Sequence, residues 1–293
     1  ELEKTFFDYA ELECLEDVRK IIKEIRQKGD EALKKFTILY DDVSLDDFRV
    51  SQQEIKRAEK KVDSSLKKAM AQAAENLKVM SRSQLNSLKN LKRKIKPGVI
   101  AEQKIIPINR VGIYVPGGRY PLFSSLLMAA IPARLAGVKE VIVCSPPSFE
   151  GSLHPVLLYA ARLSRVDEIY KLGGAQAVAA MALGTESIKK VDKIVGPGNL
   201  YVTAAKKELF GQAGIDFIAG PTELLIIADE KANPAFIAAD LIAQAEHDLR
   251  ARPVLITTEI ALAKKVNKEI EEQVKRVSTR ETAKRSLAKN GII

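Results

Sequence analysis

The chain has 293 residues, enough for one large domain or two of ordinary size, and its 46% hydrophobic and 29% charged residues are typical of a soluble globular protein. No apolar run approaches the ~20 residues that a membrane-spanning helix requires, so we expect no membrane partner. The N-terminus lacks a signal-peptide pattern, and the two cysteines, Cys14 and Cys144, form neither a disulfide framework nor a metal cluster. A cytoplasmic location is therefore expected.

The formal net charge of +9 raises the question of a nucleic-acid partner. The lysines are spread along the chain and alternate with glutamates, as they do over residues 54–61. The densest basic run, residues 89–96, contains no aromatic side chain that could stack on a base. A lysine- and glutamate-rich solvated surface is the favoured interpretation, and a basic nucleic-acid-binding protein is kept as an alternative from a different class.

Residues 1 to about 95 are expected to be helical. Apolar residues recur at close to helical spacing over residues 10–29, and Asp30 can cap a short second helix after Gly29. Ser51 and Glu54 have the spacing of a capping box, and Asp63 can start a long fourth helix. The helical region is predicted to end at the breaker formed by Lys96, Pro97 and Gly98.

From residue 111 the pattern changes to alternating strands and helices. Short β-branched runs are predicted to be buried strands at residues 111–115, 141–145, 168–172 and 192–195, each followed by an apolar helical stretch. Strands that alternate with helices at this interval require a parallel sheet covered on both faces.

Glycine-rich turns follow three of these strands, at residues 116–118, 173–174 and 196–199. In open α/β sheets such turns lie at the carboxyl ends of the strands, where ligands bind, and helix N-termini there offer N–H groups to phosphate. Glycine and proline could simply make tight connections, but three such turns in one sheet favour a nucleotide-sized site. None of them has the GxGxxG pattern, and no acid is placed as that pattern requires.

The last segment predicts a further strand–helix–strand unit. Residues 224–228 and 253–258 are expected to be strands, and Asn233 and Pro234 should begin a helix between them. On that helix Gln244 and His247 are three residues apart, which places both on one face. They could supply two zinc ligands or be an ordinary polar stripe. An amphipathic helix over 261–277 and a short helix capped by Thr279 should follow, and residues 290–293 resemble the start of another strand.

These residues closely resemble the histidinol dehydrogenase family, the last enzyme of histidine biosynthesis. Five segments carry the resemblance in the expected order: residues 111–118 with 121–125, 173–177, 191–199, 219–223 and 240–247. The first hundred residues match only as a helical lead-in.

The resemblance implies an oxidoreductase that converts L-histidinol to L-histidine by two NAD-dependent hydride transfers through a bound aldehyde. It also implies a zinc ion at the substrate site and an intertwined homodimer. By position, Tyr114, Gln176 and Asn199 would bind NAD, while Thr222, Gln244 and His247 would contact substrate. Of these, Gln244 and His247 would also bind zinc.

The sequence departs from the family at its C-terminal end. The family's Pro-Glu-His segment, whose glutamate and histidine carry out the proton transfers, would lie beyond Ile293, as would an aspartate and a histidine that complete the zinc site. With only His154 and His247 in the chain, we expect no catalytic acid or base in it, and His154 should only cap a helix. A C-terminally incomplete histidinol dehydrogenase, inactive alone, is therefore the leading hypothesis, with a non-catalytic nucleotide-binding α/β relative as the alternative.

The expected fold class is α/β, with two Rossmann-like parallel-sheet units, one inserted in the other, and a helical N-terminal lead-in. Residues 114–221 would form the inserted nucleotide-binding domain. Residues 1–113 plus 222–293 would form the discontinuous second domain.

Overall fold

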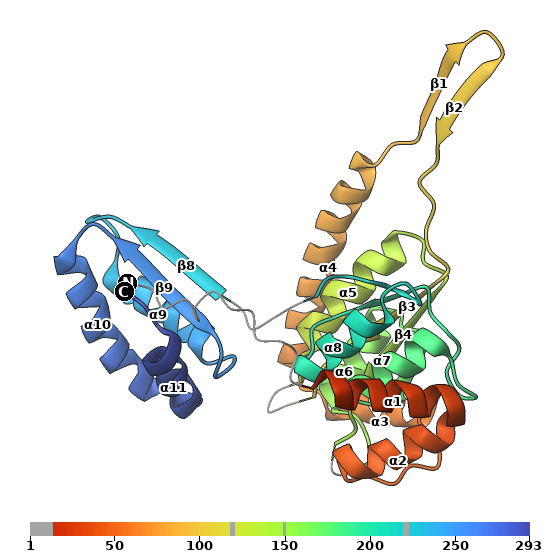
Figure 1. The fold of residues 1–293 in the computed structure, drawn as a ribbon, viewed down its shortest axis with the longest axis horizontal. Helices are drawn as coiled ribbons and strands as arrows, with labels where there is room; N and C mark the ends of the chain where they lie inside the picture. The colour runs from red at the N-terminus through yellow and green to blue at the C-terminus, as the bar shows by residue number, and fades with distance from the viewer. Residues whose placement is uncertain (1–13, 118–120, 149–150, 219–222) are drawn as a thin grey trace. The chain divides into compact units, whose positions relative to one another are not determined.

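The computed structural model describes residues 14–117, 121–148, 151–218 and 223–293. The chain divides into two compact units, residues 1–218 and 219–293 (Figure 1). The helices of the first unit are α1 (Leu15–Lys28), α2 (Asp30–Asp41), α3 (Gln52–Lys61), α4 (Ser64–Ser87), α5 (Phe123–Leu135), α6 (Pro155–Leu163), α7 (Gly174–Leu183) and α8 (Leu200–Leu209). Its strands are β1 (Leu91–Lys96), β2 (Val99–Gln103), β3 (Arg110–Tyr114), β4 (Glu140–Ser145), β5 (Glu168–Lys171), β6 (Lys193–Val195) and β7 (Gly214–Ile215).

The first unit is built on a five-stranded sheet in the order β5-β4-β3-β6-β7, and every neighbouring pair is parallel. Successive residues of a strand point to opposite faces, so Val141 and Val143 belong to one core and Ile142 and Cys144 to the other. Helices α1, α2, α7 and α8 cover the second face and α3 to α6 the first, as the two cores and Figure 1 show. The predicted doubly covered parallel sheet is confirmed.

The N-terminal helices pack directly on this sheet. Val18 and Ile21 of α1 share a core with α7 and α8, while Met70 of α4 shares the other core with α5. The predicted starts of these helices are confirmed: Ser51 and Glu54 form a complete capping box, and the Asp63 carboxylate accepts the Ser65 N–H at 2.7 Å. Residues 14–113 therefore form one compact unit with the sheet, and the proposal that 1–113 share a domain with 222–293 stays a prediction.

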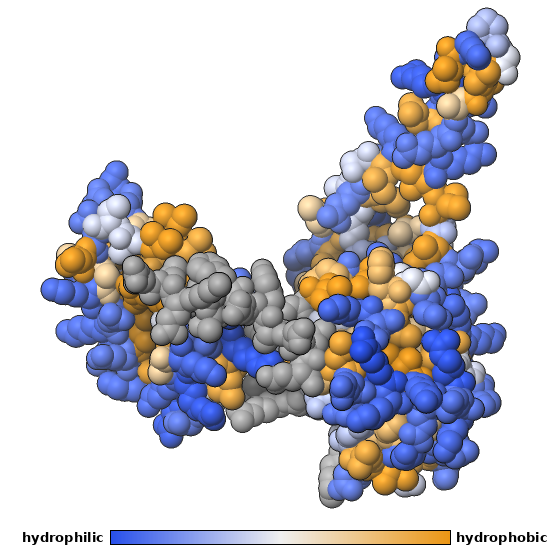
Figure 2. All heavy atoms as spheres, viewed as in Figure 1, coloured by the Kyte–Doolittle hydropathy of each residue, from blue (hydrophilic) through white to orange (hydrophobic). Residues whose placement is uncertain are grey.

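The prediction of helix up to residue 95 is wrong for its last part. Helix α4 ends at Ser87, and β1 and β2 form an antiparallel hairpin that extends away from the rest of the first unit (Figure 1). Pro97 and Gly98 make its turn, with Gly98 at φ 79°, as a tight turn requires. Both strands are exposed throughout, and hydrophobic side chains gather on this arm (Figure 2), among them Ile95 and Ile100.

The second unit contains a parallel pair of strands, β8 (Glu223–Ala228) and β9 (Arg252–Thr257). Its helices are α9 (Pro234–Ala245), α10 (Ile260–Gln273), the 3₁₀ turn η2 (Val274–Arg276) and α11 (Arg280–Asn290). Helices α9 and α10 pack on one sheet face around Leu241, Leu255 and Val266. Asn233 caps α9 as predicted, with its Oδ1 accepting the Ala235 N–H at 2.9 Å.

The last four residues only begin to pair as a strand. Ile292 makes a parallel bridge to Val254 on β9, donating its N–H to Pro253 at 3.1 Å and accepting from Leu255 at 2.9 Å. Ile293 follows the bridge, makes no further strand pairing and is 44% exposed. The parallel bridge at Ile292 agrees with the prediction that residues 290–293 are the start of another strand.

Thr279 does not cap α11, which corrects the prediction made for it. Its hydroxyl donates instead to Glu246 at 2.5 Å. Among the helices of the described segments, none is long and apolar enough to cross a membrane.

Candidate functional site at the carboxyl edge of the sheet

The strand order of the five-stranded sheet creates a topological switch point. From β3 the chain proceeds through β4 to β5 on one side, and then crosses to β6 and β7 on the other. The connections after β3 and β6 therefore leave the carboxyl ends of adjacent strands in opposite directions. In open α/β sheets this position opens a crevice in which ligands bind.

Tyr114 lies at this point, as the last residue of β3, and its side chain is buried. Its hydroxyl accepts the N–H of Gly174 at 3.0 Å and so ties the end of β3 to the start of α7. Burial raises the pKa of this phenol to about 12, so it stays protonated near neutral pH. A protonated hydroxyl that already accepts one hydrogen bond can still donate another to a ligand.

Gln176 lies in the first turn of α7, directly after the second glycine turn. Gly174 adopts φ 62°, which favours glycine, and a Cβ there would come within 2.6 Å of the Gln176 Oε1, so a larger residue would displace this amide. Pro146, which follows β4, packs against Gly117 and Gly173. The first two glycine turns therefore meet at one proline, although Gly118 lies outside the described residues.

Asn199 begins α8 after the third turn and accepts the Val202 N–H with its Oδ1 at 3.1 Å. The cap leaves the amide nitrogen of Asn199 available as a donor. The same turn begins at Gly196, where φ is 114° and a Cβ would collide with the Tyr114 carbonyl oxygen. The turn after β6 thus packs directly on the backbone of the residue that ends β3.

Two charged side chains hold Gly196 in place. Asp216 accepts its N–H at 2.8 Å, and the ammonium group of Lys206 donates to its carbonyl oxygen. Lys206 and Asp216 are themselves paired at 2.7 Å, and Lys206 is 4% exposed. Sequence reasoning missed both residues. Lys206 could have been found from its spacing, because it lies four residues after Val202 and three before Leu209, on the apolar face of the predicted helix.

Asp41, the last residue of α2, is a further polar group near this edge. Its Oδ1 would lie 3.2 Å from a Cβ at Gly173, and its Oδ2 is buried without a hydrogen-bond partner among the described residues. Burial raises the pKa of this carboxyl group to about 6. It was not predicted from the sequence, where it is one of two successive aspartates after a helix.

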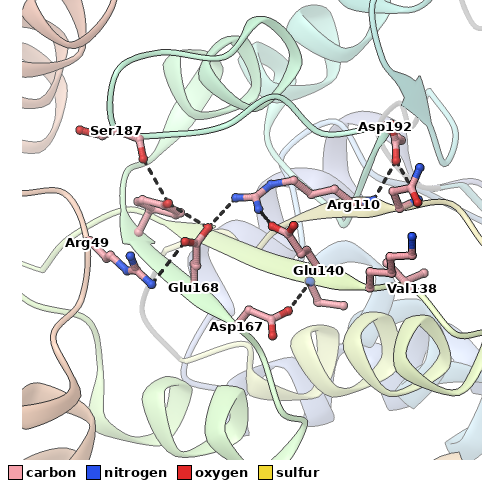
Figure 3. Close-up of polar contacts among 12 residues, drawn as sticks. Arg49, Arg110, Val138, Glu140, Asp167, Glu168, Ser187 and Asp192 are labelled. Atoms are coloured by element: carbon pink, nitrogen blue, oxygen red, sulfur yellow. Dashed lines mark hydrogen bonds and ion pairs between the residues drawn. The ribbon is translucent and has the colours of Figure 1, made fainter.

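The opposite, amino edge of the sheet carries a closed charge network (Figure 3). Buried Arg110 pairs with Glu140 and Glu168, and Glu168 also accepts from Arg49 and the Tyr170 hydroxyl. Asp192 accepts the backbone N–H of Arg110 at 2.8 Å. Because these charges satisfy one another, we assign this cluster to stability and not to ligand binding.

Gln244 and His247 lie in the second unit, in and just after the last turn of α9. The predicted helix through His247 is wrong, because α9 ends at Ala245 and His247 lies in the following turn. The His247 N–H still donates to the Gln244 carbonyl at 3.3 Å, so the two residues remain close. Asp248 accounts for the early end, since its carboxylate accepts the Arg250 N–H at 2.8 Å and stabilises a turn.

These two residues do not complete a zinc site. The described segments hold no group of three or more His, Cys, Asp or Glu side chains placed to bind a metal. An imidazole and an amide oxygen provide at most two of the four ligands that zinc takes in proteins.

Three further predictions concern residues away from this pair. Thr222 lies outside the described residues. His154 has the predicted capping role, with its Nδ1 accepting the Val156 N–H at 3.2 Å. The catalytic glutamate and histidine expected beyond Ile293 stay a prediction, because the described residues run only as far as Ile293.

Comparison with known proteins agrees with this arrangement. The histidinol dehydrogenase family model matches residues 8–293. The chain belongs to the histidinol dehydrogenase family. It is 49% identical over 277 residues to a histidinol dehydrogenase of Bacillus cereus, covering 94% of this chain and 64% of the relative. It is 46% identical over 281 residues to that of Methanothermobacter thermautotrophicus, covering 96% of this chain and 66% of the relative.

A solved histidinol dehydrogenase from Elizabethkingia anophelis superposes with a TM-score of 0.90 at 40% identity, covering 98% of this chain and 66% of that one. The chain thus spans just under two thirds of the length of the relatives it matches. The alternatives of a non-catalytic relative and of a nucleic-acid-binding protein gain no support from these comparisons.

The family's expected cofactor residues therefore come together around one edge. Tyr114, Gln176 and Asn199 stand at the carboxyl ends of β3, β5 and β6, strands that are separated by long stretches of sequence. Gln244 and His247 belong to the other unit.

Proposed function

We propose that this chain carries the NAD-binding site and one side of the substrate site of a histidinol dehydrogenase. The reaction is the oxidation of L-histidinol to L-histidine in two successive hydride transfers to NAD, through an aldehyde that stays bound. The observation that carries the proposal is the convergence of Tyr114, Gln176 and Asn199 at a topological switch point, in a chain of this family.

In this proposal each of the three residues has a distinct polar role. The Tyr114 hydroxyl and the Asn199 amide nitrogen are donors left over after each side chain has accepted one hydrogen bond. The Gln176 amide, folded over the turn before α7, can both donate and accept. The first turns of α7 and α8 offer backbone N–H groups to the pyrophosphate.

We further propose that Thr222, Gln244 and His247 contact the substrate and that Gln244 and His247 belong to a zinc site. A bound zinc ion would position the substrate through its amine and imidazole nitrogens. The proton-transfer pair and two further zinc ligands would come from the part of the relatives' length that this sequence does not cover. The proposed assembly is a homodimer, which light scattering of the purified protein tests.

Calorimetric titration of the 293-residue chain with NAD tests the cofactor site. We expect saturable binding that falls about tenfold in Gln176→Ala, the loss expected for one or two hydrogen bonds. Gln53→Ala, in the first turn of α3, is the control for removing a glutamine side chain from a helix start, with Gln53 exposed and Gln176 buried. Absence of NAD binding by the unmodified chain would refute the proposal.

The reaction itself requires two comparisons. The 293-residue chain should form no NADH from histidinol, while a chain extended to the length of the relatives should do so. Within the extended chain, His247→Ala should lower zinc content and turnover, and His154→Ala should leave both unchanged. Zinc content equal to that of the unmodified protein in His247→Ala would contradict its role as a ligand.

A further inference from the structure

The turn after β6 is held by an ion pair between buried Lys206 and partly buried Asp216, at the point where the sheet's own hydrogen bonds stop. Strand β6 ends at Val195, and its last rung with β7 joins Ile194 to Ile215. The next residues on the two strands are Gly196 and Asp216. There the Asp216 carboxylate, rather than a backbone carbonyl, accepts the Gly196 N–H at 2.8 Å. The ladder is thus extended by one rung through a side chain.

Lys206 completes the attachment from the other side of the turn. Its ammonium group donates to the Gly196 carbonyl oxygen and to the Asp216 Oδ1, the latter at 2.7 Å. Asp216 Oδ1 also accepts the N–H of Phe217 at 2.8 Å. Both polar groups of the Gly196 residue are therefore bound by charged side chains. Pro197, which follows, has no N–H with which to fix the turn itself.

An ion pair removed from water contributes little to the stability of a fold, so the role of this pair is better sought in the backbone groups that it binds. Desolvating an ammonium group and a carboxylate costs roughly what their attraction returns, so apolar residues of similar volume would serve the core equally well. The position of Lys206 on an otherwise apolar helix stripe, between Val202 and Leu209, makes such a replacement easy to accommodate. An apolar pair would, however, lose the hydrogen bonds to the N–H and the carbonyl oxygen of Gly196.

We infer that Lys206 and Asp216 are a positioning pair that fixes the Gly196–Asn199 turn in its cofactor-receiving conformation. The inference rests on the proposed function, because it assumes that NAD binds over this turn. Neither side chain is required to touch the cofactor. Gly196 packs against the Tyr114 carbonyl, with space for no Cβ, and Asn199 caps α8 three residues later. A change at Gly196 therefore displaces both neighbouring NAD contacts.

The test uses two variants that separate stability from position. Lys206→Met leaves the partly buried Asp216 carboxylate without its cation, so it should lower both the Tm and the NAD affinity. Lys206→Met with Asp216→Asn removes both charges and keeps an oxygen for the Gly196 N–H. It should regain most of the lost Tm, while NAD affinity stays lower by about tenfold because the Gly196 carbonyl has no donor.

Lys207→Met is the matched control, because Lys207 is the next residue of the same helix and is exposed. It should change neither measurement. If the double variant regains NAD affinity together with its Tm, the pair has only a structural role and the inference is wrong. A single variant that binds NAD as tightly as the unmodified chain would also overturn it.

Hydrogen exchange gives a second measurement that needs no cofactor. In both variants the Gly196 amide and the Val202 amide, which Asn199 caps, should exchange faster, while those of β3 and β4 keep their protection. Unchanged exchange at Gly196 in both variants would overturn the inference whether or not NAD binds. Failure of the unmodified chain to bind NAD, with faster exchange in the variants, would instead refute the proposed cofactor site.

Discussion

The amino and carboxyl edges of the five-stranded sheet differ in how the backbone groups at the strand ends are satisfied. At both edges the strands end and their backbone groups lose the sheet ladder. At the amino edge Arg110, Glu140, Glu168 and Asp192 satisfy one another and the nearby backbone (Figure 3). At the carboxyl edge the strands run into glycine turns and helix N-termini, which present backbone groups to the outside.

The difference shows in how burial affects the acids at each edge. Burial alone would raise the pKa of Glu168, but its hydrogen bond to Arg110 and that cation's charge outweigh burial, and the pKa is lowered. Asp41 near the carboxyl edge has no such cation, and burial raises its pKa to about 6. The charges at the amino edge are paired, although the buried Arg110 Nε has no hydrogen-bond partner among the described residues, whereas Asp41 has no cation beside it. This difference in charge pairing separates the structural cluster from the candidate ligand site.

Disrupting the charge cluster at the amino edge should give the largest loss of stability and leave NAD affinity unchanged. Arg110→Met leaves Glu168 and Glu140 without their shared cation and should lower the free energy of unfolding by about 3–5 kcal/mol. Arg162→Met is the control, because Arg162 is half exposed and pairs with a glutamate at the surface, and it should lose less than ~1 kcal/mol. Urea unfolding measures both.

If the amino edge is purely structural, NAD affinity of the folded Arg110→Met protein should equal that of the unmodified chain. A loss of NAD affinity larger than the Arg162→Met control, measured well below the unfolding transition, would show that the two edges are coupled.

Disrupting the carboxyl edge should instead have its main effect on NAD affinity. Gly196→Ala forces a side chain into φ 114° and against the Tyr114 carbonyl, which we expect to cost about 2–4 kcal/mol and to abolish measurable NAD binding. Gly211→Ala is the control, since Gly211 has φ 93° but nothing within 4 Å of its Cβ position. It carries only the backbone cost of about 1 kcal/mol. Equal NAD affinity in the two variants would refute the close packing of this turn as a requirement.

The sequence predicted four of the five strands of this sheet, because each is a short β-branched run between glycine or proline turns, but it missed the two-residue strand β7. It also placed the three glycine turns beside Tyr114, Gln176 and Asn199 at the carboxyl ends of strands, while the NAD-binding role of these residues stays a prediction. The hairpin of β1 and β2 was missed because both strands are exposed on both faces, β1 is lysine-rich, and neither strand shows a clear alternation of apolar and polar residues.

Other features depend on pairings that sequence spacing does not reveal. Lys206 and Asp216 lie ten residues apart on different elements and meet at Gly196, and nothing in their spacing indicates this shared target. The end of α9 at Ala245 depends on the competing turn at Asp248. The division of the chain after residue 218 follows from packing of α1 and α4 on the sheet, which a helical pattern alone does not predict.

Substitution of Asp41 should give the smallest change in stability, with a size that depends on pH in a defined way. Its pKa is raised from 3.8 to about 6, so between these values the folded protein holds a proton that the unfolded chain releases. This contribution favours folding at low pH and is lost as pH rises through about 6. Asp41→Asn removes it, and after allowance for partial solvent exposure the variant should be more stable by about 1 kcal/mol near pH 7.

The gain in Asp41→Asn should shrink as pH falls and vanish near about pH 4, where the unmodified carboxyl group is protonated when folded. Urea unfolding at several pH values measures this, with Asp42→Asn as the control because Asp42 is the exposed neighbour on the same chain segment. A gain that does not change with pH would mean that the substitution acts through packing. A loss of stability near neutral pH would mean that the Asp41 carboxylate has a cationic partner, and the carboxyl edge would then be as closed as the amino edge.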